Sequence, residues 1–322
     1  MFNTLRAVAA AGIAVFCTFG LAATSHAEQR IAYKSAKTGT SYYQMGVELA
    51  NAIKKGTKGG TILTIEESQG SVQNVMEASV RAGNYVFTSP PGLVESAMAG
   101  KGPFKNRPKE AFAKIRALFP IPSLTMHFVM RGDKHVDHFS DLAGKTILLG
   151  KGSFGAREGA KYLKLFGLDG KVRIASAELG NAADALKNGQ IDGFVTAGSF
   201  PAPNVVQAAA STPVSLVSMT DAEIAKTGRT KQIIPAGTYA GVNQDVDTTS
   251  LPVEAFTTTA MDDNTAYMLT KTFWQQKALL SKDAPWWKAV TPEMLMGTGV
   301  KLHPGAIRYY EEVGIKVPAN MR

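Results

Sequence analysis

The chain has very little cysteine and no long apolar run beyond its first residues. Its 322 residues contain one cysteine, Cys17, which lies in an apolar N-terminal segment. If that segment is removed, no thiol remains for disulfides, thiolate nucleophiles or cysteine metal sites. Further along, no stretch offers the roughly 20 uninterrupted apolar residues that a membrane-spanning helix needs. These absences exclude a disulfide scaffold, a cysteine-dependent enzyme and a later membrane anchor.

Signature motifs of common enzyme classes are missing as well. The chain has no G-x-S-x-G nucleophile elbow, no G-x-x-x-x-G-K-[ST] and no H-E-x-x-H. His135 and His138 share a polar turn, but their spacing matches no defined set of metal ligands. We therefore expect no metal, no cofactor and no catalytic residue, and we expect that the protein is not an enzyme.

Acidic residues are fewer than basic ones, which gives a formal net charge of +9. A positive net charge attracts anionic ligands or negatively charged membrane surfaces. The lysines and arginines are scattered, however, and no basic run with interleaved aromatic residues occurs. Nucleic acid is therefore not an expected partner.

The first 27 residues have the pattern of an export signal. Arg6 supplies a positive charge, residues 7–23 form an apolar and small-residue run, and Ser25-His26-Ala27 has the small-x-small pattern of a cleavage site. We expect residues 1–27 to be a signal peptide that is cleaved after Ala27. The mature chain of about 295 residues is long enough for two domains.

The remaining sequence alternates strand and helix patterns, which is typical of an α/β protein with largely parallel sheets. Two segments, residues 125–130 and 253–259, are candidate strands that cross between two halves of the chain. We expect a discontinuous lobe 1 of residues 28–125 and 256–322, and a lobe 2 of residues 126–255. Two lobes joined by two crossings imply a ligand cleft that closes about a hinge.

Two strand–turn–helix corners near the start of the mature chain share one chemistry. The first corner is Thr38-Gly39-Thr40-Ser41-Tyr42, and the second is Ser68-Gln69-Gly70-Ser71. A helix N-terminus has backbone N–H groups without partners and a partial positive charge, so both corners suit a carboxylate or a phosphate. Simple N-capping by serine and threonine is the alternative for either corner alone.

A third loop, Gly150–Gly155, satisfies G-x-G-x-x-G between a strand and a helix, with Glu178 further on as a ribose partner would require. An exported oxidoreductase, or another enzyme that uses this loop for a cofactor, is therefore an alternative function. The same loop serves a small anion equally well, with Ser153 as a donor and Arg157 as a charge partner.

Five ordered segments carry a resemblance to a known family. They are Thr38–Tyr43, Glu67–Asn74, Ala183–Gly193, Ile234–Tyr239 and Leu302–Ala306. Together they resemble the TAXI-type solute receptors of TRAP transporters over essentially the whole mature chain. The chain departs from the family pattern at Ala36 and Lys37, which replace glycines, and at Phe154.

The resemblance implies a two-lobed periplasmic binding protein of the type II kind, active as a monomer. Such a protein captures an amino acid or organic acid, with glutamate-like carboxylates as the best-known class. It delivers the solute to integral-membrane permease subunits that an ion gradient drives. A binding module that signals through a membrane partner is a third candidate.

Candidate ligand contacts follow from the corners, from the loop and from this resemblance. The candidate contacts from both lobes are Thr38, Gly39, Thr40, Ser41, Tyr42, Ser68, Gln69, Gly70, Ser71, Thr88, Ser89, Ser153, Phe154, Arg157, Gly198 and Ser199. We expect backbone and hydroxyl groups to donate to the carboxylate, and Tyr42 and Phe154 to pack against its carbon skeleton.

Overall fold

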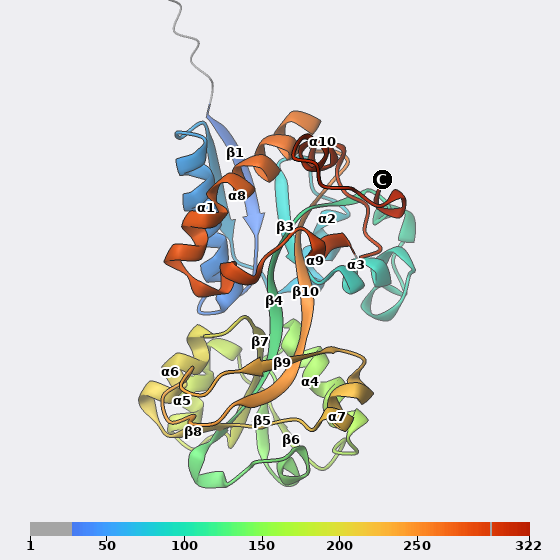
Figure 1. Ribbon diagram of the computed structural model, residues 1–322. Helices are drawn as coiled ribbons and strands as arrows, with labels where there is room; N and C mark the ends of the chain where they lie inside the picture. The colour runs from blue at the N-terminus through green and yellow to red at the C-terminus, as the bar shows by residue number, and fades with distance from the viewer. Residues whose placement is uncertain (1–27, 297) are drawn as a thin grey trace, which may run out of the picture.

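A computed structural model describes residues 28–296 and 298–322 (Figure 1). The expected signal peptide, with Cys17 and the cleavage point after Ala27, lies outside the described residues. Within the described ranges, no helix is both long and apolar enough to cross a membrane.

The elements alternate as an α/β chain. The strands are β1 Gln29–Lys34, β2 Thr61–Glu66, β3 Tyr85–Ser89, β4 Ile115–Arg131, β5 Thr146–Leu148, β6 Arg173–Ala175, β7 Gly193–Gly198, β8 Val214–Leu216, β9 Thr230–Ile234 and β10 Val246–Thr258. The α-helices are α1 Ser41–Gly56, α2 Ser71–Ala78, α3 Pro91–Met98, α4 Phe154–Leu165, α5 Ala182–Lys187, α6 Pro203–Ser211, α7 Asp221–Thr227, α8 Asp263–Asp283, α9 Glu293–Met296 and α10 Pro304–Glu312. Short 3₁₀ turns complete the chain, among them η5 Leu179–Asn181 and η6 Pro285–Ala289.

The ten strands of the described residues belong to one curled sheet, whose main order is β2-β1-β3-β10-β4-β7-β5-β6. At one end β2, β1 and β3 are parallel, and at the other β7, β5 and β6 are parallel. Antiparallel β4 and β10 lie between these two groups. In Figure 1 they run as two long strands from the upper lobe into the lower one. The expected two-lobed α/β architecture with two crossing strands is confirmed.

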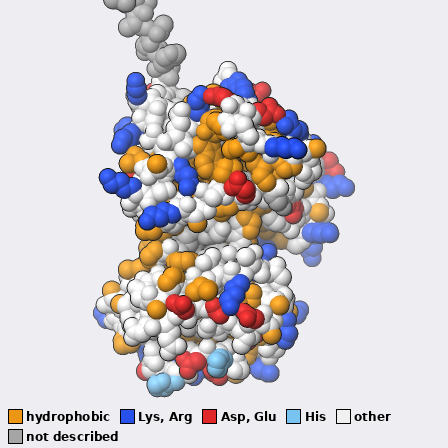
Figure 2. All heavy atoms as spheres, viewed as in Figure 1, with side chains coloured by type: hydrophobic (Ala, Val, Ile, Leu, Met, Phe, Trp, Pro, Cys, Tyr) orange, Lys and Arg blue, Asp and Glu red, His pale blue; other side chains and the backbone are white. Residues whose placement is uncertain are grey.

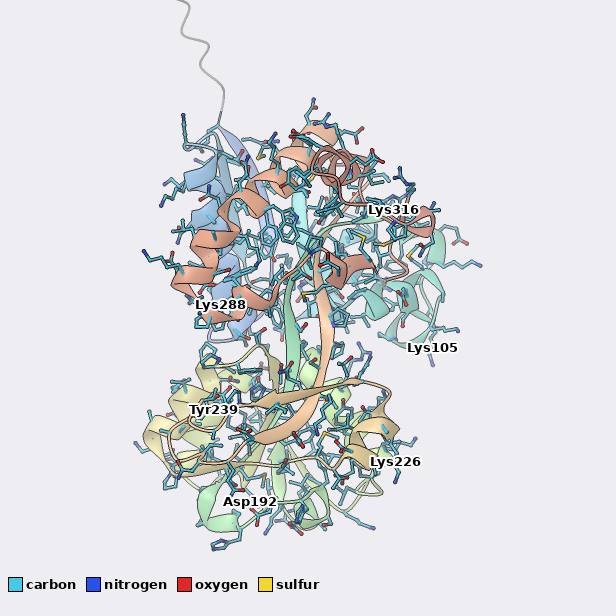
Figure 3. All side chains as sticks on the ribbon, viewed as in Figure 1. Lys105, Asp192, Lys226, Tyr239, Lys288 and Lys316 are labelled. Atoms are coloured by element: carbon cyan, nitrogen blue, oxygen red, sulfur yellow. The ribbon has the colours of Figure 1, made fainter. Side chains whose placement is uncertain are left out.

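Lobe 1 contains the N-terminal elements from β1 to α3 and the C-terminal helices α8 to α10, and lobe 2 contains β5 to β9 with α4 to α7 (Figure 1). Figure 3 places Lys105, Lys288 and Lys316 on lobe 1, and Asp192, Lys226 and Tyr239 on lobe 2. The boundaries that we expect at 125/126 and 255/256 fall inside β4 and β10. Because both strands continue through the two lobes, the exact boundaries stay a prediction.

The crossing strand β4 is longer than the sequence suggests. The sequence predicts a strand over residues 125–130, whereas the strand has 17 residues, begins at Ile115 and includes Pro120 and Pro122. Proline lacks a backbone donor and is tolerated at a free strand edge. At both prolines this edge has no partner strand among the described residues, because β4 pairs with β7 only from Thr125 onward and meets Leu302 only at Ala117.

Buried apolar side chains stabilise both lobes. In lobe 1, α8 packs on α1 and α10, and Phe273 of α8 stacks on Phe119 of β4 with ring centroids 4.2 Å apart. A second buried cluster lies wholly within lobe 2 and includes Leu186, Phe194 and Val205. Figure 2 shows a narrowing between the lobes, with basic side chains scattered over the visible face.

Candidate functional site

A cavity of about 40 Å³ lies between the two lobes. It is formed where strands β1, β2 and β3 end in lobe 1 and where β5 and β7 end in lobe 2. Ligands in α/β proteins bind at such carboxyl ends of parallel strands. Its wall consists of Ser35, Ala36, Lys37, Thr40, Tyr42, Gln69, Gly70, Ser71, Thr88, Pro90, Leu124, Ser153, Phe154, Gly155, Leu179, Ala197 and Val253.

The first corner contributes the N-terminus of α1. Thr40 is the N-cap, and its hydroxyl accepts a hydrogen bond from the Tyr43 N–H at 3.5 Å. The N–H groups of Ser41 and Tyr42 precede the first intrahelical bond and have no partner within the helix. The Tyr42 hydroxyl donates to the carbonyl of Pro122 in β4 at 2.9 Å. The first corner is therefore held against a crossing strand.

The second corner contributes the N-terminus of α2. Gly70 has φ +121°, a conformation that residues with a side chain rarely adopt, and no side chain caps the helix here. The Gly70 N–H donates to Ser68 Oγ at 3.0 Å, and the Gln69 N–H donates to Gln73 Oε1 at 2.7 Å. The N–H groups of Ser71 and the next residue are left without a partner within the helix.

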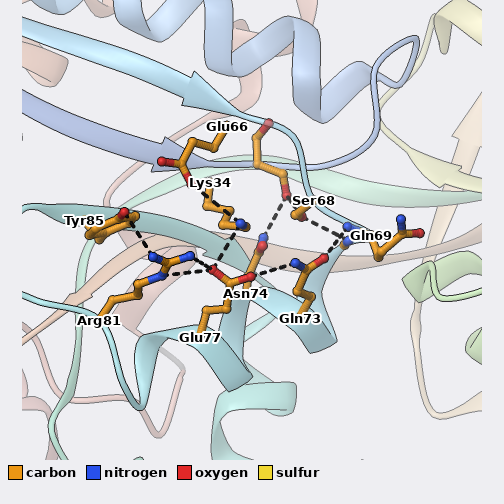
Figure 4. Close-up of polar contacts among 11 residues, drawn as sticks. Lys34, Glu66, Ser68, Gln69, Gln73, Asn74, Glu77, Arg81 and Tyr85 are labelled. Carbon is orange, nitrogen blue, oxygen red and sulfur yellow. Dashed lines mark hydrogen bonds and ion pairs between the residues drawn. The ribbon is translucent and has the colours of Figure 1, made fainter.

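A network of hydrogen bonds and ion pairs holds the second corner in place (Figure 4). Gln73 donates to Glu77 at 2.6 Å, and Glu77 forms ion pairs with Lys34 at 3.0 Å and with Arg81 at 2.9 Å. The pKa of Glu77 is lowered: burial opposes the shift, but the hydrogen bonds from Gln73, Lys34 and Arg81 outweigh it. The network therefore ties α2 to β1 and orients the loop that faces the cavity.

Lobe 2 contributes a third helix N-terminus. Ser153 is the N-cap of α4, and its hydroxyl accepts a hydrogen bond from Ala156 N–H at 2.9 Å. The ring of Phe154 is buried and forms part of the cavity wall. A Cβ atom added to Gly70 would lie 3.6 Å from the backbone N of Phe154, so the second corner and this loop touch across the cleft. Three helix N-termini thus face one cavity, which favours an anion there.

Lys37 is a site residue that the sequence reasoning did not select. Its side chain lines the cavity, is nearly buried, and pairs with Glu178 of lobe 2. Lys37 is the one charged side chain among the described residues of the wall. The available signal was the replacement of a family glycine by lysine beside the first corner. Glu178, which a dinucleotide site would place on a ribose, is instead the partner of Lys37.

The structure brings half of the candidate residues onto the cavity wall and leaves the others around it. On the wall are Thr40, Tyr42, Gln69, Gly70, Ser71, Thr88, Ser153 and Phe154; off it are Thr38, Gly39, Ser41, Ser68, Ser89, Arg157, Gly198 and Ser199.

The residues off the wall have identifiable roles or positions. Thr38 and Gly39 are exposed, and Ser41 packs against Gly198 across the cleft, where an added Cβ would overlap Ser41 Oγ. Ser199 donates to the carbonyl of Ser123 at 2.7 Å, which fastens lobe 2 to β4. Arg157 lies outside the cavity.

Several buried polar atoms near the cavity have no hydrogen-bond partner within the described part of the chain. They are Ser35 Oγ, Ser41 Oγ and Asn74 Oδ1. Ser35 is on the cavity wall, and Asn74 Nδ2 donates to the carbonyls of Ser35 and Thr88 at 2.7 and 2.8 Å. Buried polar atoms are normally paired, so the Ser35 hydroxyl on the wall is available to a polar ligand in the cavity.

The motif Ile234–Tyr239 supports the lobe 2 side of the cleft from a distance. The Tyr239 hydroxyl hydrogen-bonds His127 Nε2 at 2.9 Å and accepts from the Ala202 N–H at 2.8 Å. His127 Nδ1 lies 3.1 Å from the carbonyl of Thr125, which can only accept, so Nδ1 carries the proton and Nε2 accepts from Tyr239. Tyr239 thereby connects β4 to the segment that follows Ser199.

Solved structures of other proteins share this fold. MatC from Rhodopseudomonas palustris, solved with bound malate, aligns with a TM-score of 0.56 at 13% identity over 88% of this chain and 96% of its own. The periplasmic binding protein BugD aligns with a TM-score of 0.58 at 10% identity over 90% of this chain and 95% of its own. A protein from Bordetella bronchiseptica RB50 aligns with a TM-score of 0.52 at 15% identity, over 90% and 83% of the two chains.

At these identities the likeness shows the fold alone, a fold that the periplasmic binding protein BugD shares. The family assignment comes from the sequence, because the model of one family matches residues 34–314, nearly the whole described chain. The chain therefore belongs to the NMT1-like family.

Proposed function

We propose that this protein is an exported, periplasmic receptor that binds a small carboxylate and is not an enzyme. The observation that carries the proposal is the convergence of three helix N-termini and the Lys37 ammonium on one cavity between two lobes. These groups supply hydrogen-bond donors and positive charge to a carboxylate. Tyr42, Phe154 and Val253 supply apolar walls for its carbon skeleton. Malate in MatC, which shares the fold, is a ligand of this chemical class.

The destination of the solute is part of the same proposal. The five ordered motifs resemble TAXI-type receptors, and this resemblance supports delivery of an amino acid or organic acid to a TRAP-type permease by a monomeric receptor. A cofactor-dependent enzyme is less well supported, because Glu178, which a dinucleotide site would place on a ribose, pairs with Lys37.

Thermal-shift screening tests the proposal. Amino acids and mono- and dicarboxylates are added singly, and a ligand that binds only the folded state raises the melting temperature by mass action. For the best solute, titration calorimetry compares the wild type with Ser71→Ala, Lys37→Gln and the matched control Lys54→Gln, an exposed lysine of α1. We expect Lys37→Gln to weaken binding by about tenfold or more, since it removes a nearly buried charge partner.

Ser71→Ala should weaken binding by a smaller factor, and Lys54→Gln should leave it unchanged. If no carboxylate or amino acid raises the melting temperature, the proposed function is wrong. If a carboxylate binds but both site variants match the wild type, the ligand lies elsewhere.

A further inference from the structure

A second groove, of about 350 Å³, lies next to the cavity and is again formed by both lobes. Lobe 1 contributes Pro91 and Gly92, and lobe 2 contributes Arg157 and Arg229. Phe154 lines the cavity and the groove alike, so only this ring and its neighbours separate the two spaces.

The groove carries excess positive charge. Glu158 is buried and pairs with Arg229, with 2.7 Å between Nε and Oε1. Arg157 forms no ion pair with any described residue, and its guanidinium lies 5.9 Å from the centre of the Phe154 ring. Glu158, which Lys161 also contacts at 3.7 Å, is therefore the one carboxylate among the described residues that line the groove, against two guanidinium groups. Partial burial lowers the pKa of Arg157; nearby Glu158 opposes this shift and the charge of Arg229 adds to it.

The opposite wall adds donors to this charge. Helix α3 begins at Pro91 with Pro90 as its N-cap, and no side chain caps it. The Gly92 N–H precedes the first intrahelical bond and belongs to the positive end of the helix. The groove thus presents a helix N-terminus from lobe 1 and two guanidinium groups from lobe 2.

The position of the groove gives it a role. The cavity and the groove share Pro90 and Phe154 in their walls. A solute with its first carboxylate in the cavity therefore has the positively charged groove directly beyond the Phe154 ring.

We propose that the groove lined by Arg157, Arg229 and the N-terminus of α3 is an oxyanion subsite that takes the distal acidic group of the solute. This inference rests on the proposed function, in which the cavity takes the first carboxylate. In this proposal Arg157 determines whether the protein prefers a solute with one acidic group or a solute with two.

Matched pairs of acids test the subsite. Succinate, glutarate and adipate are compared with butyrate, valerate and hexanoate by titration calorimetry on the wild type, on Arg157→Gln and on the control Lys164→Gln. Lys164 is an exposed cation of the same helix that does not line the groove. We expect at least one diacid to bind about tenfold more tightly than its monoacid. Arg157→Gln should remove this advantage while leaving monoacid binding unchanged, and Lys164→Gln should preserve it.

The other outcomes separate the two proposals. Equal binding of monoacids and diacids, or a diacid advantage that survives in Arg157→Gln, overturns the subsite and leaves the carboxylate cavity intact. Failure of every diacid to bind also overturns it, and failure of every acid and amino acid overturns the receptor as well. The last experiment uses sodium sulfate alone. If sulfate stabilises the wild type but not Arg157→Gln, and no diacid binds more tightly than its monoacid, the groove binds a free anion and its assignment to the solute is wrong.

Discussion

At the scale of single residues, His127 is a buried base kept neutral by its surroundings. Burial lowers its pKa from 6.5 to about 4, while the hydrogen bond to the Thr125 carbonyl opposes this shift. Above pH 6.5 the folded and unfolded states both hold the neutral ring. As the pH falls from 6.5 towards 4, only the unfolded state takes up the proton, so stability is lost across that window.

The expected loss approaches about 3 kcal/mol at the acid end of the window, because each pKa unit corresponds to about 1.4 kcal/mol. Urea unfolding between pH 7 and pH 5 should show a steeper loss of stability in the wild type than in His127→Asn. His135→Asn, at an exposed turn, is the control and should keep the wild-type slope. Equal slopes in the wild type and His127→Asn would contradict the assignment.

At the scale of elements, the short turn η6 is fastened to the first helix through one carboxylate oxygen. The indole N–H groups of Trp286 and Trp287 donate to Glu48 Oε2 of α1 at 3.0 and 2.7 Å. Trp287 also packs edge-on against Phe273 of α8, with centroids 5.9 Å apart. Glu48 thus joins elements that are more than 200 residues apart in the chain.

Glu48→Ala should lower the free energy of unfolding by about 2–4 kcal/mol, because it leaves two indole donors without their acceptor. Glu48→Gln keeps a carbonyl oxygen and should cost clearly less. Urea denaturation of both variants, with the exposed Glu110→Ala as a control, measures the difference. A loss in Glu48→Ala no larger than that in Glu110→Ala would show that the indole bonds contribute little.

Helix starts beside Gly, Ser and Thr residues agree with the sequence pattern, whereas the short elements of lobe 2 do not follow from it. Helices α1, α2 and α4 begin at Ser41, Ser71 and Phe154, next to the Gly, Ser and Thr residues from which their starts were expected. The elements α6, β8, α7 and β9 were not anticipated. Strand β8 has three residues and β9 has five, so their apolar alternation is too short to be distinctive.

At the scale of the whole molecule, the two lobes touch across the cleft. Lys37 pairs with Glu178, and the Gly70 backbone packs on the Ser153–Phe154 turn. These contacts exist only while the lobes are together, so they favour the closed arrangement. A ligand that contacts both lobes should favour it further.

Small-angle scattering tests this closure. Saturating ligand should reduce the radius of gyration of the wild type, and Glu178→Lys should increase it without ligand, because two ammonium groups then face each other. The double variant Lys37→Glu, Glu178→Lys should restore the wild-type value. Affinity in Glu178→Lys should fall by about three- to tenfold, as expected for one partly exposed pair. An unchanged profile in every case would argue against a clamshell motion.

The sequence by itself determined the local parts of this protein: the alternating strands and helices, the Gly/Ser/Thr corners that open α1 and α2, and the loop before α4. Strand periodicity, capping and glycine conformation depend on neighbouring residues, so a short segment is enough to specify them. Motifs in order along the chain likewise indicated a family of solute receptors with two lobes.

Only the tertiary structure decided which of these parts meet. Lys37 and Glu178 are 141 residues apart, and Arg157 and Arg229 enter the same groove from different elements of lobe 2. The sequence predicts Arg157 as a charge partner for an anion at the Gly150–Gly155 loop, whereas the fold places it outside the cavity, in the groove that Phe154 also lines. Such contacts depend on the path of the whole chain through β4 and β10, and no local pattern of residues encodes that path.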